Sequence, residues 1–445
     1  VIMSRFEFRH YAKELLNIAL PIIMGNLGFI LIGAGDVLIA GRHSTDTLAA
    51  ISIATAITNC IQTFGIGLIA SVSPLLSNYR GERKSAKKYF YPTIRFSMFL
   101  GFIIMLAVLA FIPLIDFMHF EEKLVPMIKD YMFITAFATF GGYLHAALKE
   151  FLQAFEIVLV PNLVTVFSVF LNIILNAVLV FGIGPIPSLG AVGLAIASFT
   201  VRYFMGIFLL VYCFRIMKFK DYKEFDYYKS LIKIGIPISC AIMIEFIAFN
   251  SAAIVMGRVS GIYAAAQNLI STLTTVSFMV PLAISNAIAV KVGFANGAEN
   301  FYDLKRYSFV GLVMSVAFMI CSSIIFSTFP NFLVGLFTID TNLVKISVPV
   351  LYILSIFQIF DGLQVALAGI FKGIKKTGVV LLSNFTAYWV ICLPLGYTLA
   401  FKYNLMLRGF WMGLVIAAII LCIIMLVFIT KYIKDLKPSS VATEA

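Results

Sequence analysis

Charged residues are scarce in this chain of 445 residues. Asp, Glu, Lys and Arg together make up 12% of it, whereas hydrophobic residues make up 61% and the mean hydropathy is +1.02. Soluble globular proteins carry about a quarter of their residues as charged side chains. The shortage of charge excludes a soluble fold and indicates that lipid surrounds most of the chain.

The chain also lacks the motifs of enzyme, metal and nucleotide chemistry. No Walker loop, GxSxG or HExxH occurs, and the four His residues are scattered. The six Cys residues lie inside apolar runs and form no CxxC pair, so neither disulfides nor zinc are expected. We therefore expect no enzyme, no bound cofactor and no ATP-driven machinery in this chain.

Long apolar runs dominate the sequence. About twelve of them can each cross a bilayer as a helix, because lipid offers the backbone N–H and C=O groups no other partner. The expected fold class is an all-α integral membrane protein. The expected spans are 14–40, 47–77, 89–115, 125–155, 160–184, 188–217, 230–257, 262–293, 307–330, 343–371, 378–402 and 405–432.

The net charge of +12 is distributed unevenly over the loops. Basic residues cluster ahead of the first span and after the even-numbered spans, as at Arg80, Arg83, Lys84, Lys87 and Lys88 after the second. By the positive-inside rule, both termini and every even loop are cytoplasmic, as in a multi-pass protein of the cell (inner) membrane. Basic residues confined to such loops are not a nucleic-acid signature, so no nucleic-acid partner is expected.

A polar segment near the midpoint, 218–229, divides the chain. It is the expected cytoplasmic linker between an N-terminal lobe (1–217) and a C-terminal lobe with a short cytoplasmic tail (230–445). Six helices in each lobe give both lobes the same orientation, related by a pseudo-two-fold axis along the membrane normal. Two such bundles facing each other across a cleft suit transport by alternating access.

An internal repeat supports this division. A shift of 216 residues pairs Pro21 with Pro237 and the loop glycine Gly81 with Gly297. Small-residue matches are common in membrane helices, but a proline and a loop glycine that match at one constant shift indicate a duplicated architecture.

Two carboxylates lie inside apolar spans of the C-terminal half. Glu245 is near the middle of the seventh span, and Asp361 is well inside the tenth. A charge at the bilayer centre costs about +2.5 to +3.5 kcal/mol on insertion scales, so such a residue usually faces a bundle interior or a wet cavity. There it can take up a proton or bind a cation, with Na⁺ as the metal candidate. The alternative for each residue is a structural carboxylate that only packs against a neighbouring helix.

Neutral polar side chains accompany these carboxylates. Gln358 and Gln364 lie three residues to either side of Asp361, on neighbouring turns of one helical face. Gln267 in the eighth span offers either an oxygen ligand for an ion or a hydrogen-bond bridge between helices. The candidate cavity-lining residues are Phe357, Gln358, Gln364 and Asn250.

The N-terminal half carries a smaller polar set. Asp36 lies toward the outer end of the first span, where it could merely be hydrated. Asn172 and Asn176 are four residues apart on the fifth span, share a helical face, and are plausible partners for Asp36. Alternatively they hold helices together, at about 0.6 kcal/mol per hydrogen bond in a membrane.

Several stretches resemble one known family. IGIPISCAIMIEFIAF in the seventh span, GIYAAAQNLI in the eighth and FDGLQVALAGIFKGIKKT in the tenth are similar to the multidrug and toxin extrusion (MATE) family. The resemblance runs over nearly the whole chain. A Glu in span seven together with an Asp in span ten resembles the NorM-type branch more than the DinF-type branch.

The resemblance implies a secondary antiporter with two sites. Glu245 and Asp361 match the family's cation-binding carboxylates in the C-terminal lobe, and Gln267 matches a polar residue of the same lobe. Asp36, with Asn172 and Asn176, matches an ion or proton site in the N-terminal lobe. The departures are Phe357 in place of Tyr, Ile196 in place of Thr, and Asn176 in place of Asp. They weaken the case for Na⁺ in the N-terminal lobe, and leave Na⁺ and H⁺ both open as the coupling ion.

Three functions are compatible with a multi-pass helical membrane protein of this kind. The leading hypothesis is export of amphipathic, cationic organic compounds in exchange for Na⁺ or H⁺, by a monomer whose partners are the small-molecule substrate and membrane lipid. A flippase for a lipid-linked saccharide would favour a basic cavity, which the acidic intramembrane set opposes. A membrane receptor or integral-membrane enzyme is disfavoured, because no ligand domain and no catalytic cluster is present.

Overall fold

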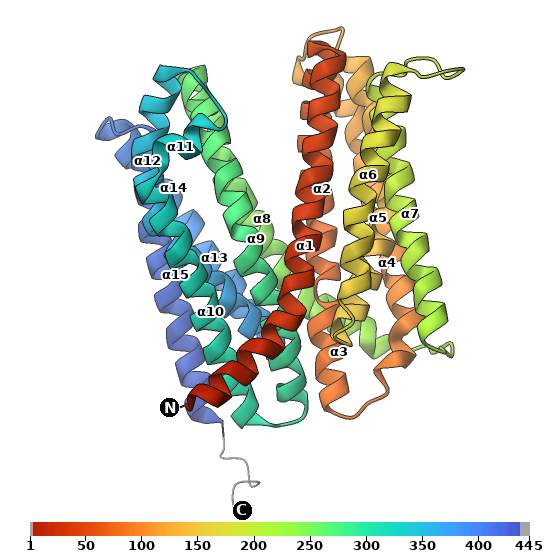
Figure 1. The fold of residues 1–445 in the computed structure, drawn as a ribbon, viewed down its shortest axis with the longest axis vertical. Helices are drawn as coiled ribbons and strands as arrows, with labels where there is room; N and C mark the ends of the chain where they lie inside the picture. The colour runs from red at the N-terminus through yellow and green to blue at the C-terminus, as the bar shows by residue number, and fades with distance from the viewer. Residues whose placement is uncertain (1–2, 437–445) are drawn as a thin grey trace, which may run out of the picture. The chain divides into compact units, whose positions relative to one another are not determined.

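Helices make up almost all the regular structure of the computed structural model, which describes residues 3–436 (Figure 1). No strand occurs within that range, and twelve helical segments in it are long and apolar enough to cross a membrane. The predicted all-α fold with twelve spans is confirmed. In chain order the helices are α1 (Arg5–His43), α2 (Thr45–Ile69), α3 (Val72–Gly81), η1 (Ala86–Tyr89), α4 (Phe90–Phe111), η2 (Ile112–Met118), α5 (Val125–Ala154), α6 (Leu159–Phe181), α7 (Ala191–Ile216), α8 (Phe225–Val259), α9 (Gly261–Gly297), α10 (Phe301–Thr328), α11 (Pro330–Gly335), α12 (Thr341–Gly373), α13 (Thr377–Asn384), η3 (Phe385–Cys392), α14 (Leu393–Tyr397), η4 (Thr398–Lys402) and α15 (Leu407–Asp435).

The helix boundaries repeat along the chain. The first residues of α2, α5 and α7 lie 216 positions before those of α9, α12 and α15, and the last residues of α1 and α8 are separated by the same distance. Pro21 lies inside α1 and its counterpart Pro237 inside α8. The shift that pairs these prolines in the sequence therefore also pairs the helices, and the predicted repeat is confirmed.

The two halves of the repeat differ in one helix, the eleventh span, which is irregular in the C-terminal half. Its eleventh span contains two π-helices, η3 and η4, whereas the corresponding helix of the N-terminal half, α6, is regular. A π-helix adds a residue to the turn and changes the direction of the side chains that follow, and it is frequent at functional sites. Tyr388, in η3, is one such side chain.

Two compact units group the described residues. The C-terminal unit holds 3–20, 77–84 and 240–436, and the N-terminal unit holds 21–76 and 85–239. This grouping differs from the predicted lobes, because the start of α1 belongs with the C-terminal unit and the start of α8 with the N-terminal one. The predicted linker, 218–229, lies inside the N-terminal unit. The end of the predicted tail, 437–445, lies outside the described residues.

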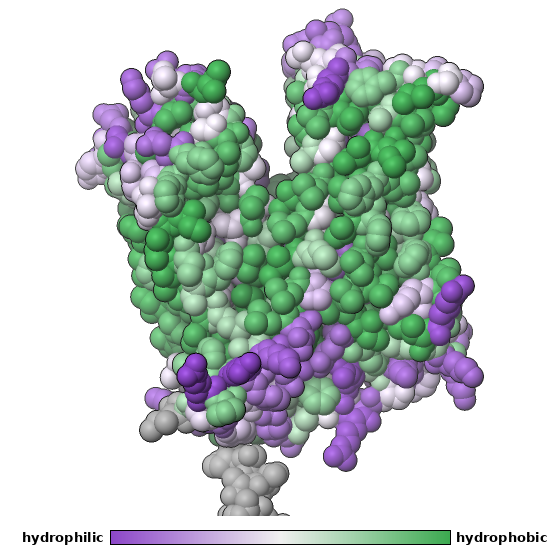
Figure 2. Space-filling view, viewed as in Figure 1, coloured by the Kyte–Doolittle hydropathy of each residue, from purple (hydrophilic) through white to green (hydrophobic). Residues whose placement is uncertain are grey.

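The surface has the hydrophobic side chains expected of a protein surrounded by lipid. Within each unit, hydrophobic side chains cover the middle of the helices and hydrophilic ones gather at their ends (Figure 2). Large apolar side chains point outward along single helices, as with Phe99 (63% exposed), Phe102 and Ile103 on α4. Such a surface is unfavourable in water and favourable against acyl chains.

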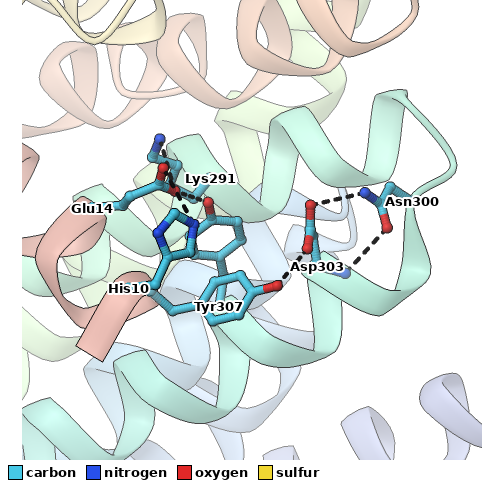
Figure 3. Close-up of polar contacts among 7 residues, drawn as sticks. His10, Glu14, Lys291, Asn300, Asp303 and Tyr307 are labelled. Carbon is cyan, nitrogen blue, oxygen red and sulfur yellow. Dashed lines mark hydrogen bonds and ion pairs between the residues drawn. The ribbon is translucent and has the colours of Figure 1, made fainter. Parts of the chain in front are cut away.

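Polar contacts fasten the start of α1 within the C-terminal unit (Figure 3). Glu14 accepts a hydrogen bond from the Tyr307 hydroxyl of α10 and pairs with Lys291 of α9, whose Nζ lies 3.5 Å from a carboxylate oxygen. One helical turn earlier, the Tyr11 hydroxyl donates to Asp303 of α10 at 2.6 Å. The carboxylate on α1 thus accepts a hydrogen bond from α10, and the carboxylate on α10 accepts one from α1. These contacts explain why the first turns of α1 group with α9 and α10.

Two repeat-related glycines allow a close approach inside the C-terminal unit. A Cβ on Gly81, at the end of α3, would lie 2.1 Å from the Phe294 carbonyl oxygen, and one on Gly297 would lie 2.0 Å from that of Asn78. The Asn78 amide also donates to the carbonyl of Gly373 at 2.8 Å. Any larger residue at 81 or 297 would force these backbones apart.

Candidate ion-coupling site

Asp361 is the most enclosed carboxylate of the C-terminal unit. It lies well inside α12 and is 3% exposed. The Gln364 amide donates a hydrogen bond to Asp361 Oδ1 at 2.9 Å, across one turn of the same helix. No other hydrogen bond to Asp361 occurs among the described residues. An ionised carboxylate can accept about four, so most of this group's capacity is available to a proton or a cation.

Glu245 of α8 approaches the same region. The Tyr388 hydroxyl of η3 lies 3.5 Å from Glu245 Oε1, which is a long hydrogen bond. Phe249, one turn after Glu245, lies 6.0 Å from the ring of Phe357, which is one turn before Asp361. The structure therefore places in one region of the C-terminal unit the two carboxylates that lie 116 positions apart in the sequence, and the charge of Asp361 acts on Glu245. Tyr388 was missed by the sequence analysis, because nothing in the chain distinguishes it from eighteen other tyrosines.

An aromatic cluster adjoins these carboxylates. The ring of Phe249 contacts three other rings. Its centroid lies 6.0, 6.1 and 6.0 Å from the centroids of Phe357, Tyr388 and Trp411. The Trp411 indole N–H donates to Gln267 Oε1 at 2.9 Å. Gln267 thus bridges helices α9 and α15, which is one of its two predicted uses. The indole was missed by the sequence analysis.

The remaining candidate cavity-lining residues differ in their surroundings. Gln358 is fully buried, and neither atom of its amide group has a hydrogen-bond partner. Phe357 is fully buried as well and packs edge-on against Trp411. Asn250 is exposed and donates to the carbonyl of Phe246 on its own helix. Gln358 is therefore the one of these side chains whose whole amide group is buried without a hydrogen-bond partner in the described part of the chain.

In the N-terminal unit, three hydrogen-bond donors approach the carboxylate of Asp36. Asn176 and Asn172 of α6 donate to Asp36 Oδ1 at 2.6 and 3.1 Å, and the Ser198 hydroxyl of α7 lies 3.5 Å from Oδ2. Both asparagines are fully buried. The structure brings together the three residues predicted for this site. The Asn172 side chain also lies beside Gly35, where a Cβ would be 3.4 Å from its oxygen.

An intramembrane arginine belongs to the same region and was missed. Arg202 lies one turn beyond Ser198 on α7, and its Nη1 donates to Gln62 Oε1 at 3.2 Å. Its aliphatic stem packs on Gly142 of α5, where a Cβ would lie 3.4 Å from its Cδ. The charge of Arg202 acts on Asp36. The signal was present in the sequence, because an arginine inside an apolar span is as unusual as a carboxylate there.

The two sites offer different chemistry. The C-terminal site has two carboxylates and few donors, so it can bind a proton or a small cation. The N-terminal site has one carboxylate, three donors and a nearby guanidinium, so the protein offsets part of its charge. Within residues 3–436 no group of three or more His, Cys, Asp and Glu could hold a metal ion. A cation at the C-terminal site would need neutral oxygens in addition to its carboxylates.

The fold and these sites define a multi-pass membrane protein with ionisable groups inside its helical units. A family model described as MatE matches residues 21–178 and 237–398, which is more than half of the chain. The chain therefore belongs to the MatE family, as the sequence resemblance indicated.

Known relatives of the NorM type support this assignment. The probable multidrug resistance protein NorM of Bacillus cereus is 27% identical over 421 residues, covering 92% of each chain. Its namesake in Mesorhizobium japonicum is 28% identical over 444 residues, covering 93% of each chain. The preference for the NorM-type branch is confirmed by these relatives.

Solved structures share the fold. A mutant of the Vibrio cholerae MATE transporter VcmN superposes with a TM-score of 0.90 at 18% identity, over 97% of this chain and 99% of that one. A MOP superfamily transporter from Pyrococcus furiosus superposes with a TM-score of 0.88 at 20% identity, over 96% and 97%.

Proposed function

We propose that this chain is a secondary antiporter that exports amphipathic, cationic organic compounds in exchange for Na⁺ or H⁺. Membership of the MatE family and the names of its NorM-type relatives support multidrug efflux. The observation that carries the coupling step is the presence of Glu245 and Asp361 in one region of the C-terminal unit, where Asp361 has one amide donor and Glu245 one hydroxyl at 3.5 Å.

The coupling follows from the cost of uncompensated charge. Two ionised carboxylates close together in a low-dielectric region repel each other and lack hydration. A proton or a Na⁺ ion relieves both costs, and so does a cationic substrate. When the ion and the substrate compete for the same negative charge, binding of one promotes release of the other, and alternating access turns this competition into exchange.

The aromatic cluster supports the proposed substrate class. Flat organic cations are attracted to aromatic faces and to carboxylates. The rings of Phe249, Phe357 and Trp411 lie within 6.0 Å of one another near Glu245 and Asp361. A flat cation would find both kinds of partner in this one unit.

The N-terminal site is proposed to assist by proton or ion binding at Asp36, with Asn172 and Asn176. Phe357, Ile196 and Asn176 each supply fewer oxygen ligands than the residues that the family often has there, so Na⁺ and H⁺ both remain candidates. We also propose, from the distribution of basic residues, that both termini are cytoplasmic in the cell (inner) membrane.

Efflux from proteoliposomes under separately imposed Na⁺ and pH gradients tests the function. The purified chain should move a cationic dye against its gradient under at least one of the two ion gradients, and no dye should move when both are absent. Failure under both gradients would refute antiport. Translocation of a lipid-linked saccharide without dye movement would instead support the flippase alternative.

A further inference from the structure

An apolar groove lies on the N-terminal unit, and none of the polar-site residues lines it. Its volume is about 470 Å³, and it is enclosed by side chains of α2, α4 and α8. The apolar side chains that line it include Phe64 and Leu68 of α2, Phe99 and Ile103 of α4, and Ile232 and Ile236 of α8. All of these residues belong to one compact unit.

The groove opens outward onto the surface that faces lipid. Phe99, Ile232 and Ile236 are 63%, 44% and 43% exposed, and all lie on helices long and apolar enough to cross a membrane. In a bilayer such a groove is filled by hydrocarbon, because an empty apolar space would forfeit dispersion contacts. An acyl chain is therefore the occupant that the surroundings supply.

One end of the groove is polar. Arg95, near the start of α4, lines it together with Tyr228 of α8. The Arg95 guanidinium donates to Asp221 at 2.8 Å, to the Tyr222 carbonyl at 2.6 Å and to the Tyr228 hydroxyl at 3.1 Å. These three bonds fix the end of the groove, and Asp221 neutralises the charge of Arg95.

Two lysines on α8 supply positive charge that is not neutralised by an ion pair. Lys229 lies one turn after the groove residue Phe225 and one turn before Ile232, so it projects from the same face of α8, and Lys233 follows one turn later. Both lysines are exposed, and neither forms an ion pair within the described part of the chain. Asp226 is the one acidic residue in this stretch of α8, so the lysines leave an excess of positive charge.

The geometry points to a binding site for an anionic phospholipid on the N-terminal unit. One acyl chain lies in the groove between α4 and α8, and the phosphate lies at its polar end against Lys229, with Lys233 reaching toward it from one turn further along α8. By the positive-inside rule this end faces the cytoplasm, whose leaflet contains the anionic lipids. A zwitterionic headgroup would place its own cation next to the two lysines, so an anionic headgroup is preferred. This site is separate from the proposed antiport and does not depend on it.

Native mass spectrometry of the full chain tests the site. The protein is purified from vesicles of phosphatidylcholine and phosphatidylglycerol in equal amounts, and the retained lipids are counted. The wild type should retain phosphatidylglycerol preferentially. The double variant Lys229→Gln/Lys233→Gln should lose that preference by about tenfold or more, since each lysine near a surface contributes measurably to anionic lipid binding. The matched control Lys431→Gln/Lys434→Gln, two exposed lysines of α15, should leave the preference unchanged.

A second variant tests the groove. Ile103→Trp fills part of it and should reduce retention of both lipids, while thermal unfolding reports whether the protein is folded. Equal retention of both lipids by the wild type would overturn the proposal. So would a Lys229→Gln/Lys233→Gln variant that still prefers phosphatidylglycerol, or a folded Ile103→Trp variant with unchanged retention.

Discussion

In the N-terminal unit, Asp36 accepts hydrogen bonds from two asparagine amides, has a serine hydroxyl at 3.5 Å, and is subject to the charge of Arg202. In the C-terminal unit, Glu245 and Asp361 share a region with one amide donor at 2.9 Å and one tyrosine hydroxyl at 3.5 Å. Equivalent halves of a repeated fold thus give their carboxylates different numbers of hydrogen-bond donors.

The contrast indicates which half needs an ion. Asp36 has neighbouring donors and a guanidinium that replace part of the water that the membrane removes, although burial remains the largest influence on it. Glu245 and Asp361 have fewer donors between them, and the charge of Lys372 acts on Glu245, so their joint ionisation favours a ligand with positive charge. The less compensated pair is therefore the better coupling site.

Neutralising the C-terminal pair should have the largest effect. Glu245→Gln or Asp361→Asn should reduce dye export to the level of empty vesicles, because a neutral side chain no longer alternates between ion and substrate. Export assays and expression levels should be measured together. Glu122→Gln, which removes an exposed loop carboxylate, is the control and should export normally. Normal export by both neutral variants would show that this pair does not couple.

Removing Arg202 should show how much its positive charge stabilises the Asp36 site. Arg202→Gln leaves Asp36 without its cationic neighbour and should lower the free energy of unfolding by about 1–3 kcal/mol. In a double-mutant cycle with Asp36→Asn, the two changes should be non-additive by about 0.5–3 kcal/mol. Unfolding in detergent measures both quantities, with Arg258→Gln as the exposed-arginine control. Strict additivity would mean that Arg202 does not compensate Asp36.

The bridge between α9 and α15 should matter for stability. Trp411→Phe keeps a buried ring but removes the donor to Gln267, leaving a buried amide oxygen without its partner, at a cost of about 1–3 kcal/mol. Trp389→Phe is the matched control, because its indole is partly exposed and its bond to the Ile244 carbonyl is long, at 3.4 Å. Thermal unfolding of both variants compares them, and equal losses would argue against the Gln267 bridge.

The smallest effect should come from a loop. The hydrogen bond from Arg95 holds the pKa of Asp221 below its ordinary value of 3.8. A carboxylate with a lowered pKa stabilises the folded state at neutral pH, and that contribution is lost as the pH falls through the lowered pKa. Asp221→Asn should therefore unfold at a slightly lower temperature than the wild type at pH 7, with a difference that shrinks toward pH 3. A difference that grows on acidification would contradict this assignment.

Much of the fold could be predicted from the sequence, because a membrane-spanning helix needs a long apolar run and a duplicated fold leaves a constant shift between matching residues. Apolar length and the shift that pairs Pro21 with Pro237 predicted the twelve spans and the repeat. The grouping of the start of α1 with α9 and α10 was not predicted, because it depends on side-chain contacts such as that between Glu14 and Tyr307. No local pattern encodes a contact between residues 293 positions apart.

The site was predictable to the extent that its residues are unusual in lipid. Glu245, Asp361 and Asp36 stand out as charges inside apolar runs, and the rule that identified them applies equally to Arg202. Tyr388 could not have been identified in this way. Its position near Glu245 depends on the π-helix η3, whose extra residue per turn leaves no signature in composition or periodicity.

Competition between ion and substrate tests the central claim most directly. Binding of a labelled cationic dye to the purified protein should be measured against rising Na⁺ at constant pH, and against falling pH without Na⁺, for the wild type and for Glu245→Gln. The account predicts that at least one ion displaces the dye from the wild type and that neither ion does so in the variant. Dye binding to the wild type that neither ion alters, or equal displacement in Glu245→Gln, would contradict it.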